Sequence, residues 1–512
     1  MNTLSLLKKM SALLFGALLG ASALAQAGLE AQLKVIDASA GPRIEPAIYG
    51  QFVEHLGRGV YDGLWVGPAS KIPNIRGWRK DAVDALKKIH VPVVRWPGGC
   101  FADDYDWRDG IGAPNARPQR INKVWGGVPE SNRVGTHEFM DLAEQIGAEA
   151  YIAGNMGSLP PRSMAQWLEY MTAERGSLAD ERRKNGRDKP WKVPYFGVGN
   201  ESWGCGGNMR PEYSADLHRR YATFLRGTKM KVASGDGEGR DEVTETLMAR
   251  AGTQMDALSL HYYTVPGPWE NKGQSTGFTP LRWAETLQSA MKIEGRIETT
   301  EAIMDRHDPK KRVALFVDEW GTWHDEEPGK QGMLFQQNTM RDALVAALSF
   351  NAFHRHTERV KMANIAQVAN VLQAMVLTKG ERMLLTPTYH VFDMYQPFQG
   401  AMPLQLDLKA PEYREGSVTL PMVQASAAKT VDGKIVLALV NLDPLHGVSV
   451  KTSLQGRAEG RVLTAAKMDA HNSFEAPDAL KPGAYAARAS ANGLVFDLPA
   501  MSVVVVTMKL AD

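Results

Sequence analysis

Two glutamates stand at the ends of apolar runs that lie far apart in the chain. The first run, residues 195–198, leads through Asn200 to Glu201 and then into a loop rich in glycine. The second run, residues 313–317, leads directly to Glu319. Short apolar runs of this kind predict buried strands. A carboxylate that ends such a strand beside polar and aromatic side chains is poorly explained by packing alone, so we interpret both as chemically active.

Two carboxylates brought together in this way are the groups that a retaining glycosidase needs. One is protonated and assists the leaving oxygen, while the other is ionised and attacks the sugar. Glu201 is predicted as the acid/base, because Asn200 would bind a sugar hydroxyl while Trp203 shields the carboxyl and favours its neutral form. Glu319 is predicted as the nucleophile, since polar neighbours would keep it charged.

The polar cage expected around Glu319 consists of Arg95 and Tyr263, which follow two other predicted strands. Asp318 directly precedes Glu319. Successive side chains of a strand alternate between its two faces, so Asp318 is predicted to point away from the site. His261 is predicted either to contact the substrate or to be a satisfied core histidine.

Further polar side chains follow the first and last predicted strands. Glu54 is predicted to accept hydrogen bonds from sugar hydroxyls, with structural ion pairing as its alternative, and Gln367 follows the last strand. The set has no metal-ligand spacing, and the one histidine cluster, residues 354–356, lies beyond a predicted helix. We therefore expect neither a metal nor a cofactor.

The scaffold that must position these residues is an alternating one. Between residues 48 and 385, apolar runs alternate about eight times with segments of helical periodicity. Such alternation predicts parallel strands with crossover helices, closed into a (β/α)8 barrel of the α/β class, whose working residues follow the carboxyl ends of the strands. An open doubly wound sheet would need an early phosphate-binding GxGxxG motif, and none occurs in the right context.

The pattern changes between residues 386 and 512. Short β runs such as 434–441 and 502–509 are separated by turn residues, which predicts a C-terminal all-β sandwich. Residues 26–47 include an alternating run, 29–39, that comes too early for the barrel. We expect it to join the sandwich.

The N-terminus is typical of a signal peptide. Lys8 and Lys9 precede an apolar stretch, residues 10–19, and an Ala-Leu-Ala cleavage site follows at 23–25. The apolar stretch is too short to span a bilayer. These features predict a signal peptide over residues 1–25 and an exported protein, periplasmic or extracellular, with a retained anchor as the alternative.

The net charge bears on the possible binding partners, and the two cysteines bear on a possible disulfide. A net charge of +2 over 512 residues gives no indication of binding to nucleic acid or to anionic membranes. The two cysteines, Cys100 and Cys205, both lie in segments predicted at the active face. Export permits a disulfide between them. Two free thiols fit the sequence equally well, because a disulfide also requires a suitable Cα separation.

Seven motifs resemble, in order, those of the α-L-arabinofuranosidases of glycoside hydrolase family 51, within the large clan of retaining (β/α)8 enzymes. They are GQFVEHLGRGVYDG (50–63), RWPGGCFADDYDWRDGIG (95–112), SNRVGTHEFM (131–140), GNESWGCGGNM (199–209), LHYYT (260–264), DEWGTWH (318–324) and MANIAQVANV (362–371). They cover the whole predicted barrel, and the β domain fits the family's C-terminal sandwich.

The resemblance implies catalytic glutamates on strands four and seven, Glu201 as the acid/base and Glu319 as the nucleophile. Arg95 would steady the nucleophile. The resemblance also implies the residues of an arabinofuranose subsite: Glu54, Asn200, Tyr263, Trp323 and Gln367. Relatives commonly form homo-oligomers, which extends to this chain as an expectation.

One position departs from the family pattern. Many members carry Asn where this chain has Cys100. A thiol cannot replace the two-way hydrogen bonding of an amide. Cys100 is therefore expected either to make a looser substrate contact or to shape the pocket through a disulfide to Cys205.

The reaction that follows from this resemblance is the release of terminal α-L-arabinofuranosyl residues from arabinan- or arabinoxylan-type chains by double displacement. A β-xylosidase or an endo-glucanase on the same scaffold is the first alternative, because a fold does not fix a substrate. A non-catalytic carbohydrate-binding protein is the second, and the presence of both strand-end glutamates argues against it.

Overall fold

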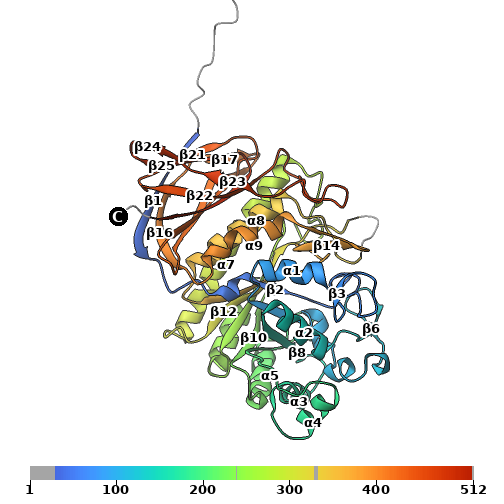
Figure 1. Ribbon diagram of the computed structural model, residues 1–512. Coiled ribbons are helices and arrows are strands. Elements are labelled where there is room, and N and C mark those ends of the chain that lie inside the picture. The colour runs from blue at the N-terminus through green and yellow to red at the C-terminus, as the bar shows by residue number, and fades with distance from the viewer. Residues whose placement is uncertain (1–28, 238, 328–331, 510–512) are drawn as a thin grey trace, which may run out of the picture.

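The molecule combines a closed eight-stranded barrel with a ten-stranded sheet that packs beside it (Figure 1). The computed structural model describes residues 29–237, 239–327 and 332–509. The predicted signal peptide, residues 1–25, lies outside the described residues.

The barrel strands are parallel and pair in the closed order β10-β11-β12-β13-β2-β5-β8-β9. In chain order they are β2 (Gly50–Phe52), β5 (Val93–Trp96), β8 (Glu149–Gly154), β9 (Tyr195–Val198), β10 (Met230–Asp236), β11 (Ala257–Thr264), β12 (Ala314–Thr322) and β13 (Val360–Ala366). The (β/α)8 barrel predicted from the alternation is confirmed.

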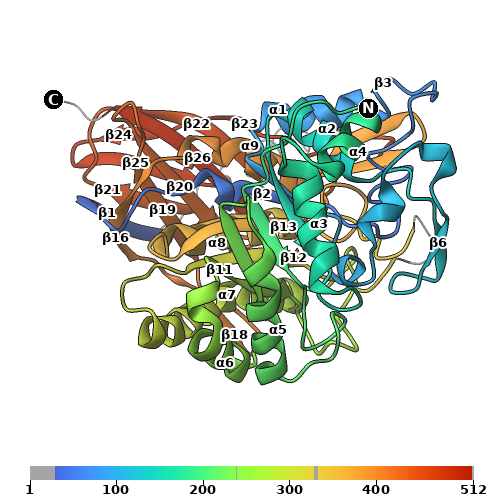
Figure 2. The same cartoon turned by 90° about the horizontal axis from the view of Figure 1, so that it is seen from below.

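Helices connect successive strands and surround the barrel, as Figure 2 shows for α3, α5 and α6. They are α1 (Lys80–Lys88), α2 (Thr136–Ile146), α3 (Pro161–Thr172), the additional α4 (Ser177–Lys184), α5 (Pro211–Phe224), α6 (Asp241–Ala251), α7 (Pro280–His307), α8 (Met340–Arg355) and α9 (Pro387–Tyr395). Among the described residues, no helix is both long enough and apolar enough to cross a membrane.

Helix α8 is buried on every side because it lies between the barrel and the β domain. Every residue from Met340 to His354 is buried, and the helix contacts β12 of the barrel as well as strands of the ten-stranded sheet. Its first turn is fixed by a capping box, in which Thr339 accepts from the backbone of Arg341 and Asp342 accepts from the backbone of Thr339. The apolar surface of α8 therefore fixes the two domains to each other.

Ten strands form the C-terminal sheet, in the order β23-β22-β26-β20-β19-β16-β1-β21-β25-β24. Their bounds are β1 (Leu29–Ser39), β16 (Met402–Lys409), β19 (Val423–Lys429), β20 (Ile435–Asn441), β21 (Val448–Thr452), β22 (Arg457–Thr464), β23 (Gly483–Ala486), β24 (Arg488–Ser490), β25 (Gly493–Leu498) and β26 (Ser502–Lys509). Strands β20 and β25 are far apart in this order yet contact each other, so the sheet folds over a shared core. Figure 1 shows the N-terminal strand β1 in blue among the later strands; it pairs with β16 and β21.

Short elements complete the fold. The two-stranded pairs are β3 (Asn74–Ile75) with β4 (Trp78–Arg79), β6 (Arg120–Asn122) with β7 (Val128–Glu130), β14 (Val376–Lys379) with β15 (Arg382–Leu385), and β17 (Glu412–Glu415) with β18 (Val418–Pro421). The 3-10 helices are η1 (Pro46–Tyr49), η2 (Cys100–Asp103), η3 (Trp107–Gly110), η4 (Pro114–Ala116), η5 (Gly252–Gln254) and η6 (Gln396–Phe398).

The expected domain boundary at residues 385 and 386 differs from the structure in one respect. Helix α9 begins at Pro387 and is the helix that follows β13, the eighth barrel strand, so the barrel extends past the boundary. Its sequence, PTYHVFDMY, is rich in β-branched and aromatic residues, which have weak intrinsic helix preference. Packing against α8 overrides that preference.

Candidate active site

The two predicted catalytic acids lie at the carboxyl ends of the fourth and seventh barrel strands. Glu201 follows β9, in a left-handed backbone conformation with a φ of 38°. Glu319 lies near the end of β12 and is 6% exposed. One oxygen of each carboxylate and one ring nitrogen of His261 all lie within 4.8 Å of one another. The barrel therefore brings together two acids that the sequence separates widely.

Both oxygens of Glu319 accept a hydrogen bond. Arg95 Nη1 donates to Oε1 at 2.7 Å, and the Tyr263 hydroxyl donates to Oε2 at 2.9 Å. Arg95 also donates through Nη2 to Asn200 Oδ1, at 2.7 Å. A Cβ atom on Gly99 would lie 2.5 Å from Glu319 Oε1, so this close approach requires a glycine. The arrangement holds Glu319 in place and favours its ionised form.

The charge of Arg95 is fixed by its surroundings. Its side chain is buried, which opposes the charged form, but the nearby Asp318 and Glu319 carboxylates raise its pKa above the ordinary value. Its guanidinium also lies over the ring of Phe52, 4.6 Å from the centroid. Arg95 is therefore a permanent cation behind the site.

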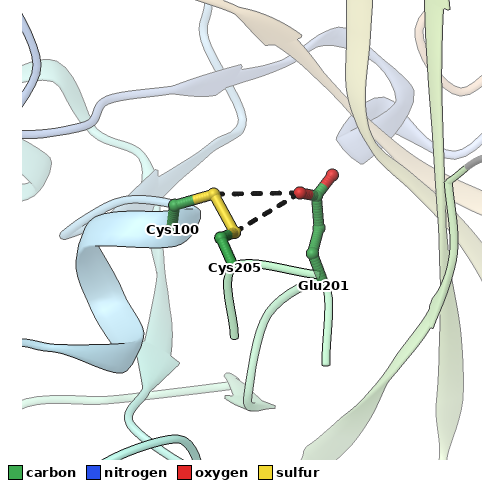
Figure 3. A group of neighbouring side chains, drawn as sticks. All are labelled: Cys100, Glu201 and Cys205. Atoms are coloured by element: carbon green, nitrogen blue, oxygen red, sulfur yellow. Dashed lines mark hydrogen bonds between the residues drawn. A yellow bond between two sulfur atoms is a disulfide. The ribbon is translucent and has the colours of Figure 1, made fainter. Parts of the chain in front are cut away.

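Glu201 accepts a hydrogen bond of 2.8 Å from Nδ1 of His261 at its Oε1. Its other oxygen, Oε2, faces a disulfide between Cys100 and Cys205, whose Cα atoms are 5.5 Å apart (Figure 3). Oε2 lies 3.8 Å from Cys100 Sγ and 3.5 Å from Cys205 Sγ. Disulfide sulfurs carry no proton, so these are polarisable, non-donating contacts. The bridge ties η2, which follows β5, to the loop that follows β9.

His261 is buried among three carboxylates. Besides Glu201, its Nδ1 lies 3.5 Å from Glu319 Oε2, and its Nε2 lies 3.3 Å from Asp318 Oδ1. Burial alone would lower the pKa of the imidazole, but the attraction of Glu319, the ion-pair contact with Asp318 and the hydrogen bond with Glu201 raise it to about 10. Of the two predictions for His261, the structure agrees with a buried histidine whose two ring nitrogens both have partners, and contact with the substrate stays a prediction. The ring lies behind the two acids.

Asp318 does not point away from the site, and that prediction is wrong. Its Oδ2 accepts from the Tyr151 hydroxyl at 2.7 Å inside the barrel, while Oδ1 faces His261. The reason is a β-bulge. The pairing of β12 with β11 and with β13 shifts register between residues 316 and 320, so β12 contains an extra residue there. A bulge breaks the alternation of side chains, and both acids turn inward.

Glu54 lines the same pocket as the two acids. Its Oε1 accepts from the backbone N–H groups of Gly99 and Phe101, each at 3.0 Å, and from Trp125 Nε1 at 2.9 Å. Gln367 Nε2 lies 3.4 Å from Oε2. Burial and the nearby negative charge of Glu319 raise the pKa of Glu54 to about 7, although these donors favour the charged form.

Asp103 holds the loops that follow β8 and β9 through its carboxylate. Its carboxylate accepts three backbone hydrogen bonds: from Asn200 at 2.7 Å, from Met156 at 2.6 Å and from Gly157 at 2.8 Å. It thereby connects η2 to the loops that follow β8 and β9. Burial raises the pKa of Asp103 to about 7, against the effect of these three donors.

A small cavity opens between the acids. Of the predicted substrate-binding residues, five line it together with Glu201 and Glu319: Glu54, Cys100, Tyr263, Trp323 and Gln367. The other three, Arg95, Asn200 and His261, lie behind the acids and contact them or one another. The cavity is also lined by residues that the sequence reasoning did not single out: Leu56, Trp125, Leu334 and Leu372. Trp125 lies in a long loop after Cys100 that contains several aromatic residues, and nothing in that loop singles it out.

The histidine cluster of residues 354–356 lies away from this site. His354 binds Tyr49 through one ring nitrogen and Ser426 through the other, each at 2.8 Å, so it joins the barrel to the β domain. His356 bonds to Glu301 at 2.8 Å. Within the described residues, three groups have acids, histidines or cysteines close enough to hold a metal by distance, and two of them share Glu201. In the active-site groups these atoms already bond or contact one another, and Cys100 and Cys205 are bridged.

Comparison with known proteins places this geometry in a family. Residues 85–275 match the family description "Alpha-L-arabinofuranosidase 1 domain", and residues 318–502 match "Alpha-L-arabinofuranosidase C-terminal domain". The chain is 50% identical to a GH51 arabinofuranosidase of Xanthomonas axonopodis pv. citri, with a TM-score of 0.92 over 94% of this chain and 100% of that one. The chain belongs to glycoside hydrolase family 51. It is an α-L-arabinofuranosidase, as the resemblance predicted.

Two more relatives are named as arabinofuranosidases. An "Intracellular exo-alpha-L-arabinofuranosidase" of Bacteroides ovatus is 49% identical over 93% of this chain and 95% of its own length. The α-L-arabinofuranosidase of Thermotoga maritima in complex with arabinose is 27% identical, with a TM-score of 0.83 over 94% of this chain and 100% of that one. Because these relatives are named arabinofuranosidases, they favour that prediction over the xylosidase, glucanase and non-catalytic alternatives.

The prediction of export is contradicted. The Bacteroides ovatus relative is named as an intracellular enzyme. The prediction depended on residues 1–25, where two lysines, an apolar stretch and an Ala-Leu-Ala site follow one another. This short N-terminal pattern is weaker evidence for the cellular location than a relative that matches almost the whole chain.

Proposed function

We propose that this family 51 enzyme cleaves terminal α-L-arabinofuranosides with retention, using Glu319 as the nucleophile and Glu201 as the acid/base. The observation that carries the proposal is the separation of the acids, whose nearer oxygens lie within 4.8 Å of each other. Retaining glycosidases place their carboxyl groups about 5–5.5 Å apart, whereas inverting enzymes leave about 6.5–9.5 Å for a water molecule.

The roles of the two acids follow from their partners. Glu319 accepts from a permanent cation, Arg95, and from Tyr263, so it is kept ionised for attack on the anomeric carbon. Glu201 is more exposed, with 19% of its side chain accessible, and it accepts one hydrogen bond, from His261. It can give its proton to the glycosidic oxygen and later accept a proton from water.

The reaction then has two displacements. Glu319 forms a bond to the anomeric carbon as the bond to the leaving oxygen breaks, and the proton of Glu201 goes to that oxygen. In the second step water attacks the anomeric carbon, the ester bond to Glu319 breaks, and Glu201 takes a proton from the water. The arabinose leaves with its original configuration.

The substrate class is inferred from the cavity and the relatives. Glu54 and Gln367 present hydrogen-bonding groups to sugar hydroxyls, while Trp125 and Trp323 provide flat apolar walls. The Bacteroides ovatus relative is named an exo-enzyme. We infer that this chain likewise removes terminal arabinofuranosyl residues from arabinan- or arabinoxylan-type oligosaccharides and polysaccharides.

Azide rescue tests the two roles on 4-nitrophenyl α-L-arabinofuranoside. Glu201→Ala should regain activity with azide and give the α-azide, because azide then enters the face left open by the acid/base. Glu319→Ala should give the β-azide, since azide replaces the nucleophile. Glu54→Ala is the matched control, as a third carboxyl group in the pocket that azide should not replace. Exchange of the two products, or no rescue of either variant, would overturn the assignment.

A further inference from the structure

A buried carboxylate beneath the catalytic pair has no role in the mechanism derived above. Asp318 is 1% exposed and lies inside the barrel, directly before the nucleophile in sequence. It is turned inward by the bulge in β12, although regular alternation would have placed it on the outer face. A bulge next to an active site commonly re-aims a side chain. The bulge therefore turns the Asp318 carboxylate toward the groups of the active site.

The partners of Asp318 form a chain that leads to Glu201. The Tyr151 hydroxyl donates to Oδ2 at 2.7 Å and anchors the carboxylate from below. Oδ1 lies 3.3 Å from Nε2 of His261, and Nδ1 of the same ring bonds to Glu201 Oε1 at 2.8 Å. A histidine ring held at one nitrogen by a carboxylate presents its other nitrogen in a fixed direction.

Arg95 is the other cation near Asp318, but it is bound elsewhere. Its Nη1 and Nη2 groups donate to Glu319 and Asn200, and its Nε remains 3.7 Å from Asp318 Oδ2. The carboxylate is nearer to His261, at 3.3 Å. Asp318 therefore faces two cations, and only His261 connects it to Glu201.

We propose that Asp318 is a positioning residue, which holds the His261 ring so that its Nδ1–H always faces Glu201. In its proton-donating form Glu201 must present its acidic oxygen to the leaving group. Because the His261 N–H group donates a hydrogen bond to Oε1, the transferable proton is carried by the other oxygen, Oε2. Oε2 faces the cavity beside the Cys100–Cys205 bridge. After transfer, the same hydrogen bond stabilises the Glu201 carboxylate until it acts as a base. The inference depends on the acid/base role proposed for Glu201.

Dependence on the leaving group tests this proposal. The substrates are aryl α-L-arabinofuranosides whose phenols range from 2,4-dinitrophenol, which needs no proton to leave, to phenol, which does. Asp318→Asn keeps the shape of the side chain but removes its charge. We expect kcat/KM to fall about tenfold more for the phenyl substrate than for the dinitrophenyl substrate, a part of the 10²–10⁴-fold that general acids contribute. An equal loss for all substrates would mean a merely structural role and would overturn the proposal.

Four further variants make the result specific. Asp342→Asn is the matched control, because Asp342 is also a buried carboxylate beside β12 but bonds to Thr322 and Thr339. It should lower kcat/KM equally for every substrate. Tyr151→Phe removes the anchor of Asp318, so it should show the same kind of leaving-group dependence as Asp318→Asn, but less strongly. It keeps the test decisive if Asp318→Asn does not fold. His261→Asn combined with Asp318→Asn should be no more leaving-group dependent than His261→Asn alone.

Failure of this inference can be separated from failure of the proposed function. Glu201→Ala is measured on the same substrates. If Glu201→Ala shows no leaving-group dependence, the acid/base assignment falls, and the role of Asp318 falls with it. If Glu201→Ala depends strongly on the leaving group while Asp318→Asn does not, only the positioning role is overturned.

Discussion

The hydroxyl of Tyr263 donates a 2.9 Å hydrogen bond to Oε2 of Glu319. Tyr263 lies on β11, the strand that pairs with β12, and its ring packs edge-on against Trp323 with centroids 4.9 Å apart. Burial and the adjacent Glu319 charge raise the pKa of Tyr263 well above its ordinary value, so the phenol stays protonated. Glu319 therefore has a constant donor that can loosen as the carboxylate attacks the sugar.

Replacing Tyr263 with phenylalanine should lower kcat/KM about 10- to 100-fold, because a hydrogen bond to a charged group contributes about 1.5–3 kcal/mol. Steady-state kinetics on 4-nitrophenyl α-L-arabinofuranoside would measure the loss. Tyr262→Phe is the matched control, since the adjacent Tyr262 hydroxyl donates to the backbone of Ser289, at 2.5 Å, away from the acids. Comparable losses in the two variants would contradict a specific role for Tyr263.

Reduction of the Cys100–Cys205 bridge should destabilise the protein and lower its activity. The bridge spans 105 residues of sequence; disulfides typically stabilise a fold by about 2–4 kcal/mol, and longer loops gain more. It also forms the wall beside Glu201 Oε2 (Figure 3). Thermal unfolding with and without a phosphine reductant should give a lower Tm in the reduced sample.

The double variant Cys100→Ser and Cys205→Ser provides the control for the reductant. It should unfold at the Tm of the reduced wild type, and the phosphine should not lower it further. An unchanged wild-type Tm after verified reduction of both thiols would show that the bridge contributes little to stability.

The positions of Glu201 and Glu319 could be predicted because they depend on local sequence. An apolar run followed by an acid marks a strand end, and parallel strands of a barrel bring their carboxyl ends to one face. The direction of Asp318 could not be predicted in this way. The extra residue in β12 is visible only in its pairing with β11 and β13, which are distant in sequence.

Long-range packing explains what else the sequence left open. Trp125 donates to Glu54 from a loop without periodicity, so nothing in its neighbourhood indicates that contact. Helix α9 has a composition that favours strands, and it is helical because α8 covers it. Cys100 and Cys205 are bridged because the loops after β5 and β9 meet, a proximity that spacing alone does not give.

The stability of the protein should depend on pH through His261. Its pKa is about 10 in the folded protein, above the ordinary value of 6.5. Between these values the folded state binds a proton that the unfolded state has released. The contribution is therefore fully present below pH 6.5 and is lost as pH rises through 10, at up to about 1.4 kcal/mol per pH unit.

Chemical denaturation of wild type and His261→Gln across pH 7 to 10 would measure this contribution, and the difference between them should shrink as pH rises. His218→Gln is a suitable control, because His218 is also buried but its pKa is lowered to about 4, so it stays neutral over this range. A difference between wild type and His261→Gln that does not change with pH would contradict a protonated His261.

Asp103→Asn should loosen the loop that carries Asn200 and Glu201. Asp103 Oδ1 accepts from Met156 and Gly157, and Oδ2 accepts from Asn200. An asparagine has one acceptor oxygen, so one backbone N–H would face an amide N–H₂ group. A buried donor left without a partner costs about 1–3 kcal/mol of stability. Two backbone N–H groups donate to Oδ1, so the single amide oxygen of the asparagine should occupy that position. The hydrogen bond from Asn200 should then be the one that is lost.

The expected signature of Asp103→Asn is a lower Tm together with a lower kcat, because Asn200 also binds Arg95, which holds the nucleophile. Asp104→Asn is the control, as Asp104 is the neighbouring acid and is exposed. It should change neither quantity measurably. If Asp103→Asn lost stability but kept its kcat, Asp103 would support the fold without setting the position of Asn200. If both were unchanged, the three hydrogen bonds would not be needed for either.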